Sequence, residues 1–532
     1  MNLKRTITFT FVALILLSCA QIVPLSGGEK DITPPKEVES KPKNSSINFA
    51  EKTIIIEFNE FIKLNNISSQ LIVSPLMETQ PEILVRGKKL LIKLEGELAE
   101  NTTYSLNFGN SITDITENNI FPNYKYVFST GSFIDSLSYS GIVVNAFDLS
   151  KKESIYVLLY DQFEDSIPYK EIPRYVALTD KEGNFSITNI AKGEYKFFAI
   201  NDINSNYLFD LPNEEIAFKK NIINLDSSSS DNHIYLFEEE NNLQFLDKAE
   251  NTVYGKIDLT FNQPTKNLTI NALNTNLKTP WHIEEKNECG DSITLWLTSV
   301  EGIESLDLVL KDGEEILDTT NIIIIPTSEF KDSTLQISTN ITGSFDLNKN
   351  VNISTSRPTS TQDFNSILLF EDSNQVVFDI EKSGLTNRKF SLKYAFKENT
   401  NYQLFIPPKT FEDIYGLKND TLKINFKTKK EADYGIINLK VIPNFSDNYI
   451  VQLYKNKHLI KESYFKETVK TRYKFLTPGN YELKLIIDSN NDQKWNTGNY
   501  LEGLQPEKVI YFEKEIKNRA NWDNDIIWTI NE

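Results

Sequence analysis

The sequence predicts an all-β protein, a string of antiparallel β-sandwiches with an internal duplication. Strand-like runs such as residues 52–62 (KTIIIEFNEFI) and 88–94 (KKLLIKL) are short, rich in β-branched and aromatic residues, and separated by polar turns. No stretch keeps a 3.6-residue apolar stripe for more than a couple of turns. The 532 residues, with 33 Phe and 23 Tyr, supply several cores rather than disorder.

The N-terminus predicts export and lipid anchoring. Lys4 and Arg5 precede an apolar run at residues 7–17, which is too short to span a bilayer but suits a signal peptide. The run ends in Leu-Leu-Ser-Cys, which resembles the lipobox of bacterial lipoproteins. The resemblance implies a signal peptide at residues 1–18 and a covalent lipid, palmitate included, on Cys19. An ordinary secretory signal with an incidental cysteine is the alternative.

Residues 19–33 (CAQIVPLSGGEKDIT) read as a flexible tether, because they are rich in Gly, Pro and small polar residues. We expect a protein attached to the outer membrane by its lipid. The sequence does not distinguish between the periplasmic and the cell-surface side of that membrane. Lipidation of Cys19 leaves Cys289 alone, so no internal disulfide is expected. The net charge of −18 argues against nucleic acid as a partner, since phosphate contacts need clustered Lys and Arg.

The first domain is expected at residues 34–131. Its strand IIIEFNEFI, the stretch ENTTYSLNFGNSITDITENN and the closing YVFSTG resemble a bacterial Ig-like domain of the S-layer type. Together with the lipobox and the tether, they make the chain similar to a family of Bacteroidota envelope lipoproteins with an N-terminal Ig-like domain. The resemblance implies a β-sandwich and no activity.

The second domain is expected at residues 132–246. The pieces TDKEGNFSITNI and KGEYKFFAI resemble the transthyretin-like, carboxypeptidase-regulatory β-sandwich. Asp180 to Gly183 predicts a hairpin turn, and the alternation of Phe185, Ile187 and Ile190 predicts an inward face.

The last two domains are expected to repeat the first two. Residues 396–428 parallel residues 98–130, with Glu-Asn-Thr-x-Tyr at 398–402 in the place of 100–104. Gly479 and Asp488 are as far apart as Gly193 and Asp202. We therefore predict a second Ig-like domain at 329–429 and a second transthyretin-like domain at 430–532. Between the pairs, 247–328 predicts a middle β domain of degenerate Ig-like type.

Two Asp- and Asn-rich loops are the candidate metal sites, DINSNYLFD at 202–210 and DSNNDQKWN at 488–496. Each places oxygen-bearing side chains at positions 1, 3, 5 and 9, as a short loop that wraps Ca²⁺ would. Neither has the Gly at position 6 or the Glu at position 12 of an EF-hand, so a structural Asx-turn loop is the preferred alternative. The eight candidate ligands are Asp202, Asn204, Asn206, Asp210, Asp488, Asn490, Asp492 and Asn496.

Catalysis finds little support in the sequence. His233, His282 and His458 lie in separate regions without metal-ligand spacing, and no nucleophile motif or phosphate loop accompanies them. We expect no enzymatic activity and no small-molecule substrate. The expected bound groups are the covalent lipid on Cys19 and, in the alternative in which the Asp/Asn loops bind metal, Ca²⁺. The preferred function is a scaffold or accessory subunit of an outer-membrane protein complex for barrel assembly, export or uptake. The alternative is a surface-exposed glycan-binding or adhesive module, which calcium would stabilise if the Asp/Asn loops bind it.

Overall fold

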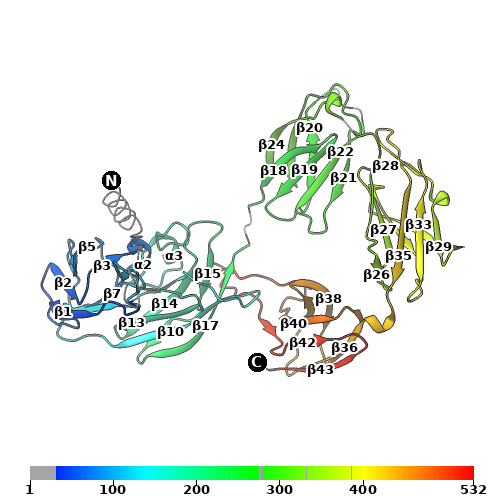
Figure 1. Cartoon of the computed structure of the whole chain (residues 1–532). Helices are drawn as coiled ribbons and strands as arrows, with labels where there is room; N and C mark the ends of the chain where they lie inside the picture. The colour runs from blue at the N-terminus through cyan, green and yellow to red at the C-terminus, as the bar shows by residue number, and fades with distance from the viewer. Residues whose placement is uncertain are drawn as a thin grey trace, which may run out of the picture. The chain divides into compact units, whose positions relative to one another are not determined.

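The structure is a computed structural model that describes residues 31–240, 243–274, 277, 279–330, 332–384 and 386–531. Strands make up nearly all of its regular elements, so the predicted all-β fold is confirmed (Figure 1). The chain divides into two compact units. Unit 1 contains the residues up to Glu239 and the segment Asn499–Gln505, and unit 2 contains the rest. Cys19 and the predicted signal peptide lie outside the described residues. Within those residues, no helix has the length and apolar character needed to cross a membrane.

The first sandwich of unit 1 packs a four-stranded sheet, β1-β2-β6-β5, against the three-stranded sheet β4-β7-β9. Alternate residues of β2, such as Ile54 and Ile56, are buried and meet Leu106 and Phe128 from the other sheet. A further two-stranded ladder is formed by β3 and β8. The elements are β1 (Glu37–Lys41), β2 (Thr53–Phe58), β3 (Ile62–Leu64), α2 (Ile67–Gln70), β4 (Ile72–Ser74), β5 (Glu82–Arg86), β6 (Lys89–Lys93), β7 (Thr103–Asn107), β8 (Ile112–Asp114) and β9 (Lys125–Ser129).

The second sandwich of unit 1 is one eight-stranded sheet in the order β12-β11-β14-β15-β17-β10-β13, with β16 paired to β14. Phe185, Ile187 and Ile190 are buried, as the alternation predicted. The predicted hairpin was wrong: Asp180 and Gly183 form the turn, but β12 pairs with β11 and β13 with β10. The elements are β10 (Leu137–Asn145), β11 (Tyr156–Tyr160), α3 (Ile167–Lys170), β12 (Tyr175–Leu178), β13 (Asn184–Ile190), β14 (Gly193–Ile200), β15 (Glu215–Phe218), β16 (Ile223–Leu225) and β17 (Ser229–Glu238).

Unit 2 begins with a sandwich of two sheets, β18-β19-β22-β21 and β20-β23-β24. These orders repeat those of the first sandwich, without a third ladder among the described residues. The strands are β18 (Leu246–Val253), β19 (Lys256–Phe261), β20 (Leu268–Ala272), β21 (His282–Lys286), β22 (Ser292–Leu297), β23 (Ser305–Asp312) and β24 (Glu315–Ile323), followed by the 3₁₀ turn η1 (Thr327–Glu329).

The next sandwich of unit 2 pairs β25-β27-β32-β31 with the five-stranded sheet β26-β35-β33-β29-β30, and adds a ladder, β28-β34. Its core includes Ile353, Leu404 and Phe426. The elements are β25 (Ile337–Thr339), β26 (Ser344–Phe345), β27 (Val351–Thr355), β28 (Thr359–Gln362), η2 (Phe364–Ser366), β29 (Leu368–Glu371), β30 (Asn374–Val376), β31 (Asp379–Ser383), β32 (Lys389–Lys393), β33 (Asn401–Ile406), β34 (Phe411–Asp413), β35 (Leu422–Thr428) and η3 (Glu431–Asp433).

The last sandwich of unit 2 has the sheets β39-β36-β43 and β38-β37-β40-β41, with β42 paired to β40. Leu439, Leu483 and Trp528 are buried between them. The strands are β36 (Gly435–Pro443), β37 (Tyr449–Lys455), β38 (His458–Phe465), β39 (Val469–Leu476), β40 (Gly479–Ile487), β41 (Val509–Tyr511), β42 (Ile516–Asn518) and β43 (Asp523–Ile530).

The duplication is visible strand by strand. The order β13-β10-β17 corresponds to β39-β36-β43, and in each set the last pair is parallel. The Glu-Asn-Thr-x-Tyr motif also folds identically in both copies: the hydroxyl of Tyr104 accepts the Ala99 N–H at 2.9 Å, and that of Tyr402 accepts the Lys397 N–H at 2.9 Å. The second residue of each motif, Asn101 or Asn399, has a positive φ, 49° and 51°.

Candidate functional site

The first predicted loop follows β14 and is organised around Asp202. One carboxylate oxygen of Asp202 accepts the N–H of Ser205 at 2.6 Å, and the other accepts the N–H of Tyr207 at 2.6 Å. Ser205 and Tyr207 have positive φ values of 60° and 64°, which local side-chain hydrogen bonds make tolerable. The aspartate at position 1 therefore fixes the backbone of its own loop.

The other predicted ligands of this loop bind one another. The side-chain amides of Asn204 and Asn206 donate to the two carboxylate oxygens of Asp210, at 3.1 and 2.8 Å. Glu214, which is 1% exposed, accepts the N–H groups of Ile203, Asp210 and Leu211. The structure thus brings all four predicted residues together and adds a buried glutamate.

The second loop repeats this arrangement after β40. Asp488 accepts the N–H groups of Asp492 and Gln493, and the amide of Asn496 donates to Asp492 at 3.0 Å. The side chains of Asn490 and Asn496 are joined at 3.2 Å. The hydrogen bond that the Asn496 amide donates to Asp492 holds the pKa of Asp492 below its usual range, and the N–H of Lys494 acts in the same direction.

Glu507 occupies the place in this loop that Glu214 occupies in the first. Its carboxylate accepts the N–H and the hydroxyl of Ser489, at 2.7 and 2.9 Å, and the N–H of Asn496 at 3.1 Å. Burial raises the pKa of Glu507, against these hydrogen bonds. Sequence reasoning missed Glu507, because ten residues lie between it and Asn496, the end of the motif. The one signal is the presence of an acidic residue after each loop.

Oxygen atoms in these loops are suitable in type for Ca²⁺, with Asp202, Asp210 and Glu214 as the acidic ligands of the first copy. Within the described residues, no group of three or more His, Cys, Asp or Glu side chains is placed to hold a metal ion. The carboxylates bind backbone N–H and amide donors instead. The calcium sites therefore stay a prediction, and the geometry describes a turn that is braced from within.

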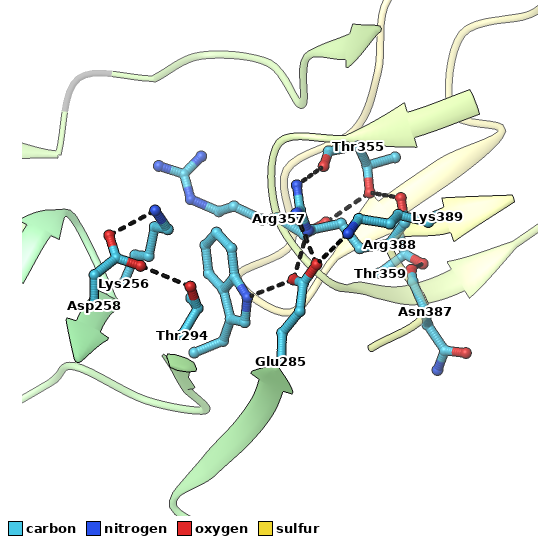
Figure 2. Close-up of polar contacts among 11 residues, drawn as sticks. Lys256, Asp258, Glu285, Thr294, Thr355, Arg357, Thr359, Asn387, Arg388 and Lys389 are labelled. Atoms are coloured by element: carbon cyan, nitrogen blue, oxygen red, sulfur yellow. Dashed lines mark hydrogen bonds and ion pairs between the residues drawn. The ribbon is translucent and has the colours of Figure 1, made fainter. Parts of the chain in front are cut away.

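A polar junction in unit 2, here called the Glu285 junction, joins the first two sandwiches of that unit. Figure 2 shows Lys389, the first residue of β32, and Arg388, the residue before it, converging on Glu285 of β21. Arg388 donates through Nε and Nη2 to the two carboxylate oxygens, at 2.9 Å each, and Lys389 Nζ lies 2.9 Å from Oε1. A bidentate pair of this kind fixes direction as well as distance.

The indole of Trp296 completes this junction. Trp296 is 2% exposed, and its Nε1 donates to Glu285 at 3.3 Å. The guanidinium of Arg388 lies 5.6 Å from the ring centre, and Lys256, which pairs with Asp258, lies 6.0 Å from it. Two cations next to one aromatic ring add cation–π attraction to the ion pairs.

The Glu285 carboxyl is strongly perturbed. Burial alone raises its pKa, but hydrogen bonds and attraction from Arg388 and Lys389 outweigh burial and lower the pKa to about 2. The side chain is 14% exposed. The junction therefore stays ionised at any physiological pH, which suits a fixed structural contact and does not suit a proton-transfer group.

A second contact supports the same pair of sandwiches. The hydroxyl of Tyr415 donates to the Leu297 carbonyl at 2.6 Å. The rings of Tyr254 and Phe330 stack at 4.3 Å, and the buried Arg357 lies 4.9 Å above Phe330. These sandwiches are held by specific directional contacts in addition to apolar packing.

The two sandwiches of unit 1 also contact each other, through β12 and β13 of the second and the sheet β4-β7-β9 of the first. Ser74 Oγ accepts the N–H of Val176 at 3.2 Å, and the N–H of Leu76 donates to the Arg174 carbonyl at 3.3 Å. Lys125 donates to Thr188 at 2.7 Å, and burial holds the pKa of Lys125 below its usual value.

The segment Asn499–Gln505 completes unit 1. Tyr500, which is 6% exposed, packs edge-on against Phe198 and Phe218, at 5.0 and 5.1 Å between ring centres. Its N–H donates to Glu239, and the Gln505 amide donates to the Phe218 carbonyl at 3.0 Å. No motif in the sequence predicted this docking.

The histidines and the free thiol do not meet. His233 lies on β17, His282 on β21 and His458 on β38, each in a different sheet. Cys289 is exposed and unpaired.

Comparison with solved structures yields weak likenesses. The S-layer protein SbsC aligns at 12% identity over 91% of this chain and 67% of its own, with a TM-score of 0.15, and its domains 5–6 align at 13% over 35% and 95%, with a TM-score of 0.18. The Yersinia pseudotuberculosis adhesin InvE aligns at 13% over 34% of this chain and 58% of its own, with a TM-score of 0.12. No curated protein matches the chain.

Residues 31–130 match the sequence model of one family, described as a bacterial Ig-like domain. The first sandwich of unit 1 is therefore a bacterial Ig-like domain.

Proposed function

We propose that the chain is a non-enzymatic envelope protein, anchored to the outer membrane by a lipid on Cys19, that acts as a scaffold or accessory subunit of an outer-membrane protein complex. The Glu285 junction is the observation that carries this proposal. Domains joined by flexible linkers need no bidentate ion pair between them, whereas a spacer that holds docking surfaces in fixed positions does. The Glu285–Arg388 pair is of this kind and is partly buried.

The positions of the carboxyl and imidazole groups in the described part of the chain also support a non-enzymatic role. Glu285, a carboxyl with a strongly lowered pKa, joins two sandwiches. The histidines lie in separate sheets, and the Asp/Asn loops are closed by their own hydrogen bonds. A β-barrel machine for assembly, export or uptake is the partner class that a lipid-anchored row of sandwiches would serve.

Crosslinking in intact membranes, followed by affinity purification, tests the proposal. The wild-type chain is expected to recover an outer-membrane protein in fixed proportion, and Cys19→Ser is expected to lose both the membrane fraction and that partner. Recovery of the free chain alone, from membranes in which the lipid is shown by mass spectrometry, would contradict the scaffold role.

A second candidate function is a surface-exposed glycan-binding or adhesive module. It is favoured by a groove of about 730 Å³ on the second Ig-like sandwich, lined by Phe370, Gln403 and Asn425 among others. Protease treatment of intact cells separates the two candidates: a surface module is cut, whereas a scaffold that faces the periplasm is protected.

A further inference from the structure

The groove lies over the outer face of the sheet β29-β33-β35. Phe370, Gln403 and Asn425 face each other across these three strands, because Phe370 is in register with Gln403 and Gln403 with Asn425. Asn425 is exposed, and Phe370 and Gln403 are partly buried. The three side chains form a row across the strands, here called the amide row, with one aromatic ring at its end.

The corresponding row in the first Ig-like sandwich has a different composition and environment. There the in-register residues are Ser74, Ser105 and Val127. All three are buried, and the neighbouring sandwich covers this face through β12 and β13. The second copy replaces three small residues by a phenyl ring and two carboxamides and leaves the face open. The same face of the fold is thus filled by protein in one copy and hollow in the other.

Most of the hydrogen-bonding capacity of the two amides in the amide row is unused. Gln403 Nε2 donates to Asn425 Oδ1 at 2.7 Å. This leaves Gln403 Oε1 as an acceptor and Asn425 Nδ2 as a donor, with no further partner among the described residues. A hydroxyl group both donates and accepts, so two neighbouring hydroxyls of one ligand would satisfy this pair.

The charge at the groove is balanced. Asp372 and Lys427 flank the amide row, one of each sign, and Asp372 accepts the N–H of Asn401 at 3.3 Å. The chain as a whole carries −18, which disfavours an anionic polymer.

We propose that the amide row is a binding site for a neutral polysaccharide. Phe370 stacks against the C–H face of a sugar ring, while Gln403 and Asn425 bond adjacent hydroxyls. The proposal deepens the second candidate function and rests on it. A peptide bound by strand addition is a poorer occupant, because β33 has β29 on one side and β35 on the other and so offers no free edge.

Affinity electrophoresis of the full chain, through gels that contain laminarin, soluble starch or galactomannan, tests the proposal. The wild-type chain is expected to be retarded by at least one of these polymers, with Phe370→Ala and Gln403→Ala each weakening the apparent affinity tenfold or more. Phe133→Ala, which removes an exposed phenylalanine of unit 1, is the matched control and is expected to change nothing.

The outcomes distinguish binding at the amide row from glycan binding elsewhere on the chain. Retardation that survives both substitutions overturns the amide-row site but leaves glycan binding in place. No retardation by any of the three polymers overturns both. A photo-crosslinker at position 425 that captures another protein, without polysaccharide binding, assigns the face to a protein partner and also overturns the proposal.

Discussion

Removing the charge pair at the Glu285 junction should loosen the contact between two sandwiches of unit 2 without unfolding either. The substitutions are Glu285→Gln and Arg388→Met, singly and together. Gln keeps the shape of Glu and can still accept from Trp296, and Met keeps most of the Arg stem over the indole.

The magnitude follows from the pKa of Glu285. Its ordinary value is 4.5 and its value in the junction is about 2, a difference equivalent to about 3 kcal/mol. Lys389, which is about half exposed, supplies part of this. We assign about 2 kcal/mol to the Arg388 pair, within the range for hydrogen bonds to charged groups.

The same shift sets a pH dependence. Because the folded pKa lies below the ordinary value, the stabilisation is complete above about pH 4.5 and is lost as the pH falls towards about 2. The wild-type junction should therefore open below pH 4, and Glu285→Gln should remove that acid dependence.

Hydrogen exchange of β21, β22 and β32, read by mass spectrometry, measures local opening and avoids a two-state assumption for a multidomain chain. The double-mutant cycle should give a coupling of about 2 kcal/mol at pH 7. The exposed pair Glu381–Lys393 on the same sheet is the matched control and should give less than about 0.5 kcal/mol. Equal coupling for both pairs would refute the reasoning.

Three further outcomes are expected. Asp114→Ala removes the acceptor of three backbone N–H groups, at 2.7, 2.8 and 3.0 Å, and should cost the first Ig-like domain about 2–4 kcal/mol in chemical denaturation; a change below 1 kcal/mol would contradict this. Tyr500→Ala should speed exchange in β14 and β15 by a local loss of about 3–5 kcal/mol, whereas the exposed Leu501→Ala should not. Chelation should leave the melting temperature unchanged, because the carboxylates of both loops already bind N–H donors; a fall of several degrees would instead assign Ca²⁺ to them.

Local pattern was sufficient to predict much of the fold. The alternation in β2 and β13 follows from the two-residue period of a strand, and the Glu-Asn-Thr-x-Tyr motif recurs with the same tyrosine hydrogen bond in both copies. The hydrogen bonds among the Asp and Asn side chains of the two loops were also predictable, since each joins residues of the same nine-residue stretch. All three features depend on neighbours in the sequence.

Contacts between distant residues could not be predicted in this way. Glu285 and Arg388 are 103 positions apart, and nothing in the residues around either one indicates the other. The Asp180–Gly183 turn was recognised, but the two strands that it connects do not pair with each other. β12 pairs with β11 and β13 pairs with β10, so the turn does not determine the strand pairing. The role of Glu507 was not predicted for a similar reason, because its hydrogen bond to the loop depends on how the residues between Asn496 and Glu507 fold back.

Unit 1 takes Tyr500 from the far side of residues 240–498, and this dictates an order of folding. Synthesis from the N-terminus produces β14 and β15 long before Tyr500. Until then Phe198 and Phe218 lack the ring that covers them. The second sandwich is therefore among the first domains to be made and among the last to be completed, and until Tyr500 arrives its exposed aromatic surface is the one that a chaperone would have to protect.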